Sequence, residues 1–597
     1  MAGLTTTLNI ANTALSFSQV SMNTISHNIA NVNTDGYSRQ EVLGGAYFVG
    51  GYGNGVKLDV IDRRVDVLLQ QRLTQQQSST GYAAAKSQYM KNLEVIFGTP
   101  GADSSLEKVI GAMFEEINNV ANYPDATSQR LNFVKRTEFV ADTLNTMDQQ
   151  LTDTARQIDN ELDSTLTQVN SALQRIHQFN EQIAQIENTS INGQNANDLR
   201  DQRQKDIDYV ASVFKVTVTE DQFGRTRMLT ESGNRLVDTS YVQFERTPAL
   251  PGQNFKGIGT RAVQVDGSLS NTVFQLDTNR LTSGKVKGMV DVRDTEIENL
   301  RDQLDNLAAG LAAEMNRVHS GGVGVPPPSS LTSAELATPG VDLFTEIGLV
   351  PGSSFDVSIV DPLTGSPANT VTVTLPAVGP YSTANLTADI NAALTGAGFP
   401  ATVTASFSGV TNKLTIADAT NTFGIVMGND ADDFLGKIQM NPLFESSVNG
   451  DPIDAGNIRV LTAISADPQL VAAARMRSAD GGLSLHDNQN ALALAAVADT
   501  NFVFNPAGGL STQNDTLAGY YITISSNLAV QLQDNTNRQD FADTLQHDLE
   551  ERKQSFAGVN MDEELANLIV FQNAFQASAR VITVVDELMD TLINIIR

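Results

Sequence analysis

The stretch LTTTLNIANTALSFSQVSMNTISHNIANV, residues 4–32, places an apolar or small residue at alternating intervals of four and three positions, and only Ser18 breaks the series. Apolar residues that recur every 3.5 positions form a seam along one side of a helix, and such a seam packs against another helix. The stretch therefore predicts a terminal helix that needs a helical partner. Its seam consists of Leu4, Leu8, Ala11, Leu15, Met22, Ile25, Ile29 and Val32.

The C-terminal end of the chain carries a second seam with the same spacing. It begins at Met561, is interrupted by the polar Gln572, and shifts by one residue after Ile582. Because one chain carries a seam at each end, we expect the two terminal helices to pair with each other. The residues that we expect to serve assembly in this second seam are Leu565, Leu568, Phe575, Ala579, Ile582, Met589, Leu592 and Ile596.

Both seams are almost free of charge. No Asp, Glu, Lys or Arg precedes Asp35, and none lies between Glu564 and Arg580. Asn, Ser, Thr and Gln interrupt both segments, which makes them too polar for a membrane span. Such helices favour burial in an assembly; the alternative is that they are ordinary amphipathic helices packed on the chain's own core.

The composition excludes several classes of partner. The chain has 597 residues, with 39 basic and 68 acidic side chains and a net charge of −29. This balance argues against nucleic-acid binding, which needs a basic surface, and against docking on anionic lipid. Cysteine is absent, which excludes disulfides and Cys-ligated metals,. The first basic residue is Arg39, so we expect no cleaved secretory signal peptide, whose first segment is positively charged,.

Long helices dominate the region between the two ends. The segment from Asp125 to about Thr189 contains neither Gly nor Pro, and at about 1.5 Å per residue it predicts a rod of about 100 Å. Such a rod suits a filamentous building block better than a compact enzyme. Further helices are predicted from about Arg64 to Phe97, from Asp291 to Val318 and from about Thr516 to Phe556.

Strand-type alternation at residues 371–375 and 403–407 predicts a β-rich segment in the middle of the chain,. Prolines 326–328 and the Asn449–Pro452 turn bound it, so we expect the flanking helices to pack on each other and not on the insert. The predicted class is multidomain α+β. Its parts are a discontinuous terminal helical domain (1–36 and 561–597), a helical rod domain (37–325 and 456–560) with a β-rich part at about 213–287, and an inserted, mainly β outer domain (326–455).

The sequence offers little catalytic chemistry. Five histidines are far apart, and none has a second His or Cys at metal-ligand spacing,. The segment that begins at Asp534 resembles a calcium loop only faintly, because Gln539 replaces the glycine and Leu545 the glutamate that such a loop needs,. We therefore predict no enzyme activity and no catalytic, cofactor-binding or metal-binding residues.

Two stretches beside the seams carry a family resemblance. SHNIANVNTDGYSRQ, residues 26–40, resembles the signature of flagellar axial proteins, and AGVNMDEEL, residues 557–565, resembles the start of the last helix in the hook-associated members of that family. NDLRDQR (197–203) and DNQNAL (487–492) resemble internal stretches of the same members, and 385–417 resembles a small β-rich module inserted in flagellins. The motif residues are Ser26, Asn28, Ala30, Asn31, Thr34, Gly36, Tyr37, Arg39, Gly558, Val559, Asn560, Asp562, Glu563 and Glu564.

The resemblance implies an extracellular structural subunit at the junction between flagellar hook and filament. It implies terminal helices that form an inner tube, and export by the flagellar type III system. Implied partners are further copies of the chain in a ring, the hook protein, a second junction protein (hook-associated protein 3) and an export chaperone at the C-terminal region. No cofactor, nucleic acid or membrane insertion is implied. The alternatives are another axial protein, of hook or distal rod, or a secreted adhesin or cell-wall-acting protein with axial-type ends.

Overall fold

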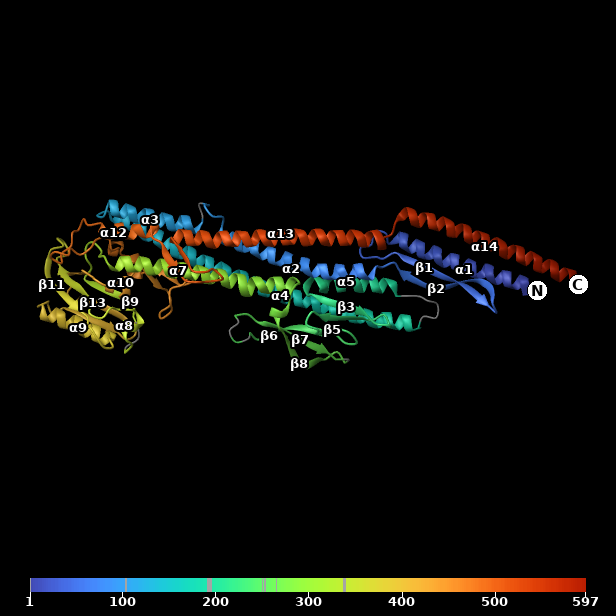
Figure 1. The fold of residues 1–597 in the computed structure, drawn as a ribbon, viewed down its shortest axis with the longest axis horizontal. Coiled ribbons are helices and arrows are strands. Elements are labelled where there is room, and N and C mark those ends of the chain that lie inside the picture. Colours follow the sequence, from blue (N-terminus) through green and yellow to red (C-terminus); the bar gives the residue numbers. More distant parts are fainter. Residues whose placement is uncertain are drawn as a thin grey trace. The chain divides into compact units, whose positions relative to one another are not determined.

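The computed structural model describes residues 2–102, 105–189, 196–249, 251, 254–264, 266–336 and 340–596. The chain is a multidomain α+β protein (Figure 1). It divides into two compact units. The terminal unit comprises Met1–Tyr89, Arg156–Arg293 and Gln533–Arg597, and the central unit comprises Met90–Ala155 and Asp294–Leu532.

The long helices follow the sequence expectations closely. The predicted rod is the helix α4 (Thr127–Thr189), and the predicted terminal helices are α1 (Ala2–Ala30) and α14 (Met561–Ile596). The segment expected from Asp291 to Val318 is divided, because a π-helical turn (Val292–Glu296) separates α6 from α7. The other long helices are α2 (Val67–Phe97), α3 (Leu106–Asn122), α5 (Asn197–Val213), α7 (Ile297–Ser320) and α13 (Leu517–Ala557), and α6 (Lys285–Asp291) is short.

The terminal unit contains three antiparallel sheets. β1 (Gln40–Val49) and β2 (Tyr52–Arg63) form a long hairpin whose turn is Gly50–Gly51. Both glycines have positive φ, +60° and +86°, as a two-residue type I′ hairpin turn requires,. The other sheets have the strand orders β3–β4–β5 and β6–β7–β8. Their strands are β3 (Val216–Glu220), β4 (Thr226–Thr230), β5 (Arg235–Val237), β6 (Val242–Thr247), β7 (Gly257–Val263) and β8 (Leu269–Leu276).

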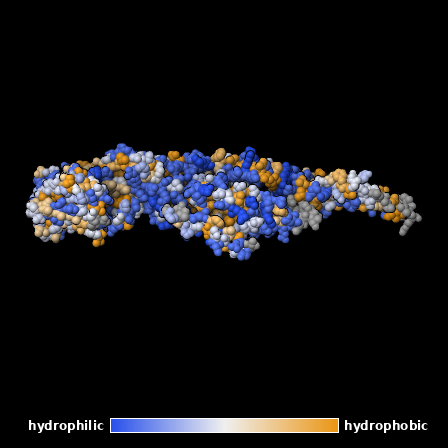
Figure 2. Space-filling view, turned by 60° about the horizontal axis from the view of Figure 1, so that its bottom comes forward, coloured by the Kyte–Doolittle hydropathy of each residue, from blue (hydrophilic) through white to orange (hydrophobic). Residues whose placement is uncertain are grey.

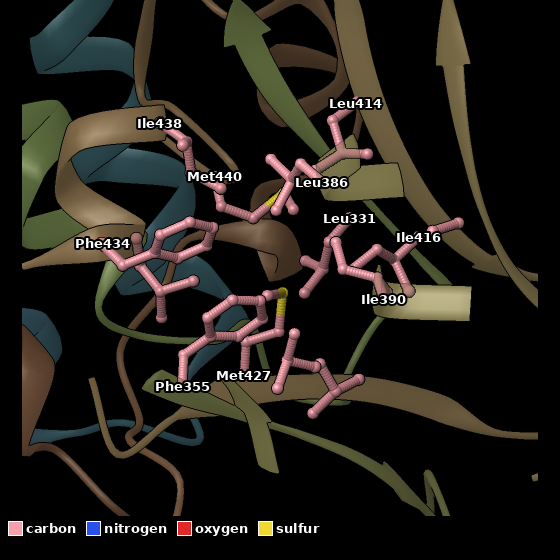
Figure 3. Close-up of a cluster of buried hydrophobic side chains, with 14 of the residues drawn as sticks. Leu331, Phe355, Leu386, Ile390, Leu414, Ile416, Met427, Phe434, Ile438 and Met440 are labelled. Carbon is pink, nitrogen blue, oxygen red and sulfur yellow. The ribbon is translucent and has the colours of Figure 1, made fainter. Parts of the chain in front are cut away.

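The β insert, residues 326–455, holds a dense core. Its two three-stranded sheets have the orders β11–β10–β14 and β12–β13–β9. Figure 3 shows Phe355 and Phe434 beside each other in this core, with ring centroids 4.1 Å apart. The elements are β9 (Ser330–Glu335), α8 (Leu343–Glu346), β10 (Ser354–Val360), β11 (Pro367–Thr374), α9 (Thr383–Gly396), β12 (Val403–Ser408), β13 (Lys413–Asp418), β14 (Gly424–Gly428), α10 (Phe434–Ile438) and β15 (Phe444–Ser446).

The helix α9 was not anticipated by the sequence analysis, which read this region as strands. Ser382 and Asn385 form a capping box at its N-terminus, which satisfies backbone donors of the first turn. Leu386, Ile390 and Leu394 follow at intervals of four and point into the core of the insert. This helical spacing spans only three turns and lies between segments with strand-type alternation, β11 and β12.

The expectation that the insert makes few contacts with the flanking helix is wrong. Asn316 of α7 is fully buried, and its side chain donates to the carbonyl of Phe444 and accepts from the backbone N–H groups of Leu443 and Phe444. His319, one turn further, lies between the carbonyl of Asn441 and the backbone N–H of residue 472. Buried polar groups of α7 are thus satisfied by the insert and, at residue 472, by the segment that follows it,.

The segment after the insert consists of short elements of the central unit. β16 pairs with β15, and β17 pairs with β18. α12 packs against α3 and α7. The elements are β16 (Ile458–Val460), α11 (Thr462–Ala466), α12 (Gln489–Ala496), β17 (Phe502–Phe504) and β18 (Gln513–Asp515), with single 3₁₀ turns at Thr278–Arg280, Pro468–Leu470 and Val497–Asp499.

Candidate assembly interface

The two terminal helices pack along each other, as the paired seams predicted (Figure 1). Phe17 of α1 and Phe571 of α14 meet with ring centroids 6.3 Å apart. Ala11, Ile25 and Val585 are buried in this pair. The expectation that the ends of the chain meet is therefore confirmed.

Pairing covers most seam residues only in part. Besides Ala11 and Ile25, the α1 seam is half-buried throughout, at Leu4, Leu8, Leu15, Met22, Ile29 and Val32. In α14 the half-buried members are Leu568, Phe575, Ala579, Ile582, Met589 and Leu592. Leu565 is exposed, because the preceding Glu564 faces inward and successive helical residues differ by about 100°,. The side chain of Ile596 lies outside the described residues.

A second set of apolar side chains on α14 faces solvent. Figure 2 shows hydrophobic residues on the surface of the terminal pair, at the right of the view. Within Leu517–Ile593 lies an 18-residue window whose mean hydropathy is 1.3 and of which 6% is buried. By length and composition alone, a helix with such a window could cross a membrane. The exposed residues are Ile569, Val570, Val581, Val584, Leu588 and Ile593.

An ion pair ties the start of α14 to the turn that follows α1. Arg39 contacts Glu564 at 2.8 Å and Glu563 at 2.9 Å. Glu564 is only 1% exposed. Burial lowers the pKa of Arg39, but the two carboxylates outweigh burial and hold that pKa above its ordinary value. We call Arg39, Glu563 and Glu564 the clasp.

Asn28, near the end of α1, links the clasp to the hairpin. Its amide nitrogen donates to Glu564 and to the carbonyl of Gln40, at 3.0 and 2.9 Å. Its amide oxygen accepts from the hydroxyl of Tyr37 and from the backbone N–H of Gln40. These four bonds use the full capacity of an Asn side chain. Burial, followed by nearby carboxylates, raises the pKa of Tyr37, so its hydroxyl stays a neutral donor.

The first turns of α5 reach the same place. Asp201 accepts hydrogen bonds from the backbone and hydroxyl of Ser38, at 2.8 and 2.9 Å, and pairs with Arg63 at 2.7 Å. Asp198 accepts from the side chain of Gln40. Three stretches that resemble the axial family, near residues 30, 200 and 560, thus converge on one polar cluster.

The remaining motif residues shape the backbone around the cluster. Gly36 has a φ of +71°, a turn conformation that glycine adopts without steric cost,. The side chain of Asn560 caps α14 by accepting from the N–H groups of Asp562 and Glu563, whereas the Glu563 carboxylate binds Arg39. The side chain of Asn31 donates to the carbonyl of residue 27, and the hydroxyl of Thr34 donates to the side chain of Asn31. Ser26, Ala30 and Asp562 are exposed. Gly558 and Val559 lie in the short link between α13 and α14.

The sequence analysis missed two contacts in this region. One is the clasp, although Arg39 is the first basic residue of the chain and residues 562–564 are the last acids before the charge-free run. The other is the close approach of the hairpin to α1. A Cβ atom on Gly44 would lie 2.4 Å from the ring of Phe17, and one on Gly55 would lie 1.9 Å from the hydroxyl oxygen of Thr13.

The structure also bears on the metal sites considered in the sequence. Within the described ranges, no group of three His, Asp or Glu side chains is placed to hold a metal ion. The segment that faintly resembles a calcium loop, from Asp534, lies inside the continuous helix α13. The site offers a polar cluster that fixes a helix pair, and apolar faces beside it.

Comparison with known proteins places these features in one family. The family described as "Flagellar hook-associated protein FlgK helical domain" matches residues 90–329. The rod families "Flagella basal body rod protein" and "Flagellar basal body rod FlgEFG protein C-terminal" match residues 8–37 and 554–595. Proteins named flagellar hook-associated protein 1, from Bacillus subtilis and Salmonella typhimurium, are each 24% identical over 98% of this chain and 97% and 99% of their own lengths. The chain is similar to flagellar hook-associated protein 1 over nearly its whole length.

The two rod-family matches cover most of α1 with its motif and nearly all of α14 with the clasp carboxylates. The counterpart in Escherichia coli is 23% identical over 98% of this chain. A solved structure, titled as the flagellar hook junction protein FlgK from Burkholderia pseudomallei, has a TM-score of 0.49 and 16% identity, and covers 81% of this chain and all of that chain. The relatives are structural proteins of the flagellum, and so is this chain.

Proposed function

We propose that this chain joins the flagellar hook to the filament as a structural subunit that assembles through α1 and α14. The observation that carries the proposal is the polar cluster around Arg39, Asn28 and Glu564. It holds the two ends of the chain as one unit, while α14 keeps an apolar face open to solvent. A monomer rarely exposes a contiguous face of this kind without a partner.

The polar cluster fixes the orientation of the helix pair α1–α14 relative to the rest of the terminal unit. Asp201 of α5 binds Ser38 and Arg63, which lie at the two ends of the segment formed by the turn and the hairpin. A buried ion pair contributes more to a unique geometry than to net stability. We infer that the cluster transmits force between the terminal helices and the rod, as an adaptor between two tubes needs.

The remaining roles follow from the same proposal. Residues 1–36 and 561–597 form the inner layer, 37–325 and 456–560 the rod domain, and 326–455 the outer domain. The seam residues of α1 and α14 contact neighbouring copies, the hook protein and hook-associated protein 3. The chain leaves the cell through the flagellar type III system, with a chaperone on its C-terminal region, and it catalyses no reaction. The match of residues 90–329 to the FlgK helical domain favours this role over that of a hook or rod subunit.

A deletion strain tests the proposal. Without the gene, we expect hooks that carry no filament, and filament subunits lost to the medium. The unmodified gene on a plasmid should restore filaments, and antibody labelling should place the chain at the end of the hook. Normal filaments in the deletion strain, or labelling along the whole hook, would contradict the proposal.

A further inference from the structure

The hairpin between α1 and the rod exposes a second apolar surface. Its tip is free of charge from residue 42 to residue 56. Tyr52 is 79% exposed and Phe48 64% exposed, and they are joined in this hairpin patch by Leu43, Tyr47 and Val49. Such large apolar side chains on a narrow hairpin have no covering element in the described part of the chain.

The inner side of the hairpin is already occupied. Gly44 and Gly55 let it lie against Phe17 and Thr13 of α1, and the backbone N–H of Val56 donates to the Thr13 hydroxyl. α14 also packs against α1, and the hairpin makes at most marginal contact with α14. The hairpin patch and the exposed face of α14 therefore do not cover each other within one chain.

Charge favours another copy of the chain as the occupant of both surfaces. A chain with a net charge of −29 repels its copies wherever acidic surfaces approach within a Debye length, about 8 Å at physiological salt,. The hairpin tip carries no charge, and α14 carries none between Glu564 and Arg580. The hairpin tip can approach this charge-free stretch of α14, which contains Ile569 and Val570, without repulsion, and both belong to the terminal unit.

We propose that the hairpin patch of one copy docks on the exposed apolar face of α14 in the next copy. The contact is heterologous, because different surfaces of the two copies meet, and a repeated heterologous contact closes into a ring or continues as a helix. This inference rests on the proposed function and names the contact through which adjacent subunits of the junction hold each other. α1 then acts as the spacer between the two docking surfaces.

Thiol cross-linking tests the contact directly, because the chain contains no cysteine of its own. Tyr52→Cys is combined in one full-length chain with Ile569→Cys, Val581→Cys or Leu588→Cys, which lie at three positions along α14. Flagella isolated from the deletion strain that carries each variant are oxidised and separated under denaturing conditions. With at least one of the three double-cysteine variants we expect a ladder of covalent multimers. Tyr52→Cys alone, or combined with Val410→Cys in the β insert (94% exposed), should give no ladder.

A charge variant provides a second, independent measurement. Phe48→Asp should leave the circular dichroism and melting of the purified chain unchanged, but abolish filaments. Leu363→Asp, at an 83% exposed position of the insert, is the matched control and should leave filaments intact.

Three results would overturn the contact: flagella that contain the chain but give no ladder with any of the three double-cysteine variants, cross-links from Tyr52→Cys to a different protein only, or full filaments with Phe48→Asp. If the unmodified chain is absent from the end of the hook, the proposed function fails first, and the contact falls with it.

Discussion

The β insert and the terminal helix pair are both rich in apolar residues, yet they bury them to very different degrees. Phe355 in the insert is completely buried, and Phe434 and Leu386 in the same core are at most 1% exposed. On α14, Val570 and Ile569 are about 60% exposed. The insert buries its large apolar side chains within one chain, whereas the terminal pair leaves some of its own apolar side chains exposed to solvent. Apolar content alone therefore does not distinguish a folding core from an assembly surface.

The largest effect on stability is expected in the insert. Phe355→Ala removes a ring that stacks on Phe434 and should lower the free energy of unfolding by about 3–5 kcal/mol, because the packed core collapses only partly around the cavity,. Urea unfolding followed by tyrosine fluorescence would measure it. A loss below about 1 kcal/mol would mean that the core of the insert is packed as loosely as the terminal pair, which would contradict the difference in burial between the two regions.

Breaking the clasp should have a large but local effect. Glu564→Ala leaves the buried guanidinium of Arg39 with one exposed partner, and removing one member of a buried pair costs about 3–5 kcal/mol,. We expect faster hydrogen exchange in α1 and in the first turns of α14, with the β insert unchanged. Glu563→Ala, at a half-exposed carboxylate, is the matched control and should cost at most about 1 kcal/mol,. Equal effects of the two variants would show that burial of Glu564 does not matter.

Acid should lower the free energy of unfolding through His319, which lies on α7 and contacts the insert at Asn441. Burial lowers the pKa of this imidazole to about 4, while in the unfolded chain it is near the ordinary value of about 6.5. The folded state therefore favours neutral His319, and its contribution is complete above pH 6.5 and is lost as the pH falls toward 4. The loss is of the order of 3 kcal/mol.

Thermal melting of the full chain between pH 7 and 4.5 would detect this loss, and His319→Gln should reduce the pH dependence. An unchanged slope in the variant would show that other groups carry the acid sensitivity.

The smallest effect on stability is expected on α14. Ile569→Ser replaces a side chain that is 58% exposed, so the free energy of unfolding should change by less than about 0.5 kcal/mol,. Filament formation should nevertheless fall, because the exposed apolar face of α14 loses one of its large side chains. A strong drop in melting temperature of the purified chain would show that Ile569 belongs to a core of the monomer, which would break the comparison.

The sequence predicted the features that depend on local spacing. The two seams predicted that α1 and α14 pair, and the absence of Gly and Pro predicted α4 almost to the residue. The glycine-rich segment from Gly44 to Gly55 indicates a loop-rich connection that bears strands, but its spacing did not predict the long hairpin. α9 was missed because its apolar spacing covers only three turns within a region of strands.

Contacts between distant residues could not be obtained in the same way. The pairing of Arg39 with Glu564 and the bonds between Asn316 and residues 443–444 depend on which segments meet in space. One sequence contains no information of that kind beyond charge sign. The assembly role of the seam residues stays a prediction, because a single chain does not show which of its surfaces a neighbour covers.

The bond between Asn28 and Glu564 joins residues separated by 536 positions. The start of the chain is synthesised first, and its polar groups near Asn28 stay open until residues from the far end arrive. Closing a loop of this size costs little more entropy than closing one half as long, about 0.6 kcal/mol for a doubling, so chain length alone does not prevent the bond. A chain that stops before residue 560 has no carboxylate to offer Arg39. The terminal pair can thus form only on a chain whose last helix is present, so a chain that stops before α14 leaves Arg39 and Asn28 without their carboxylate partner.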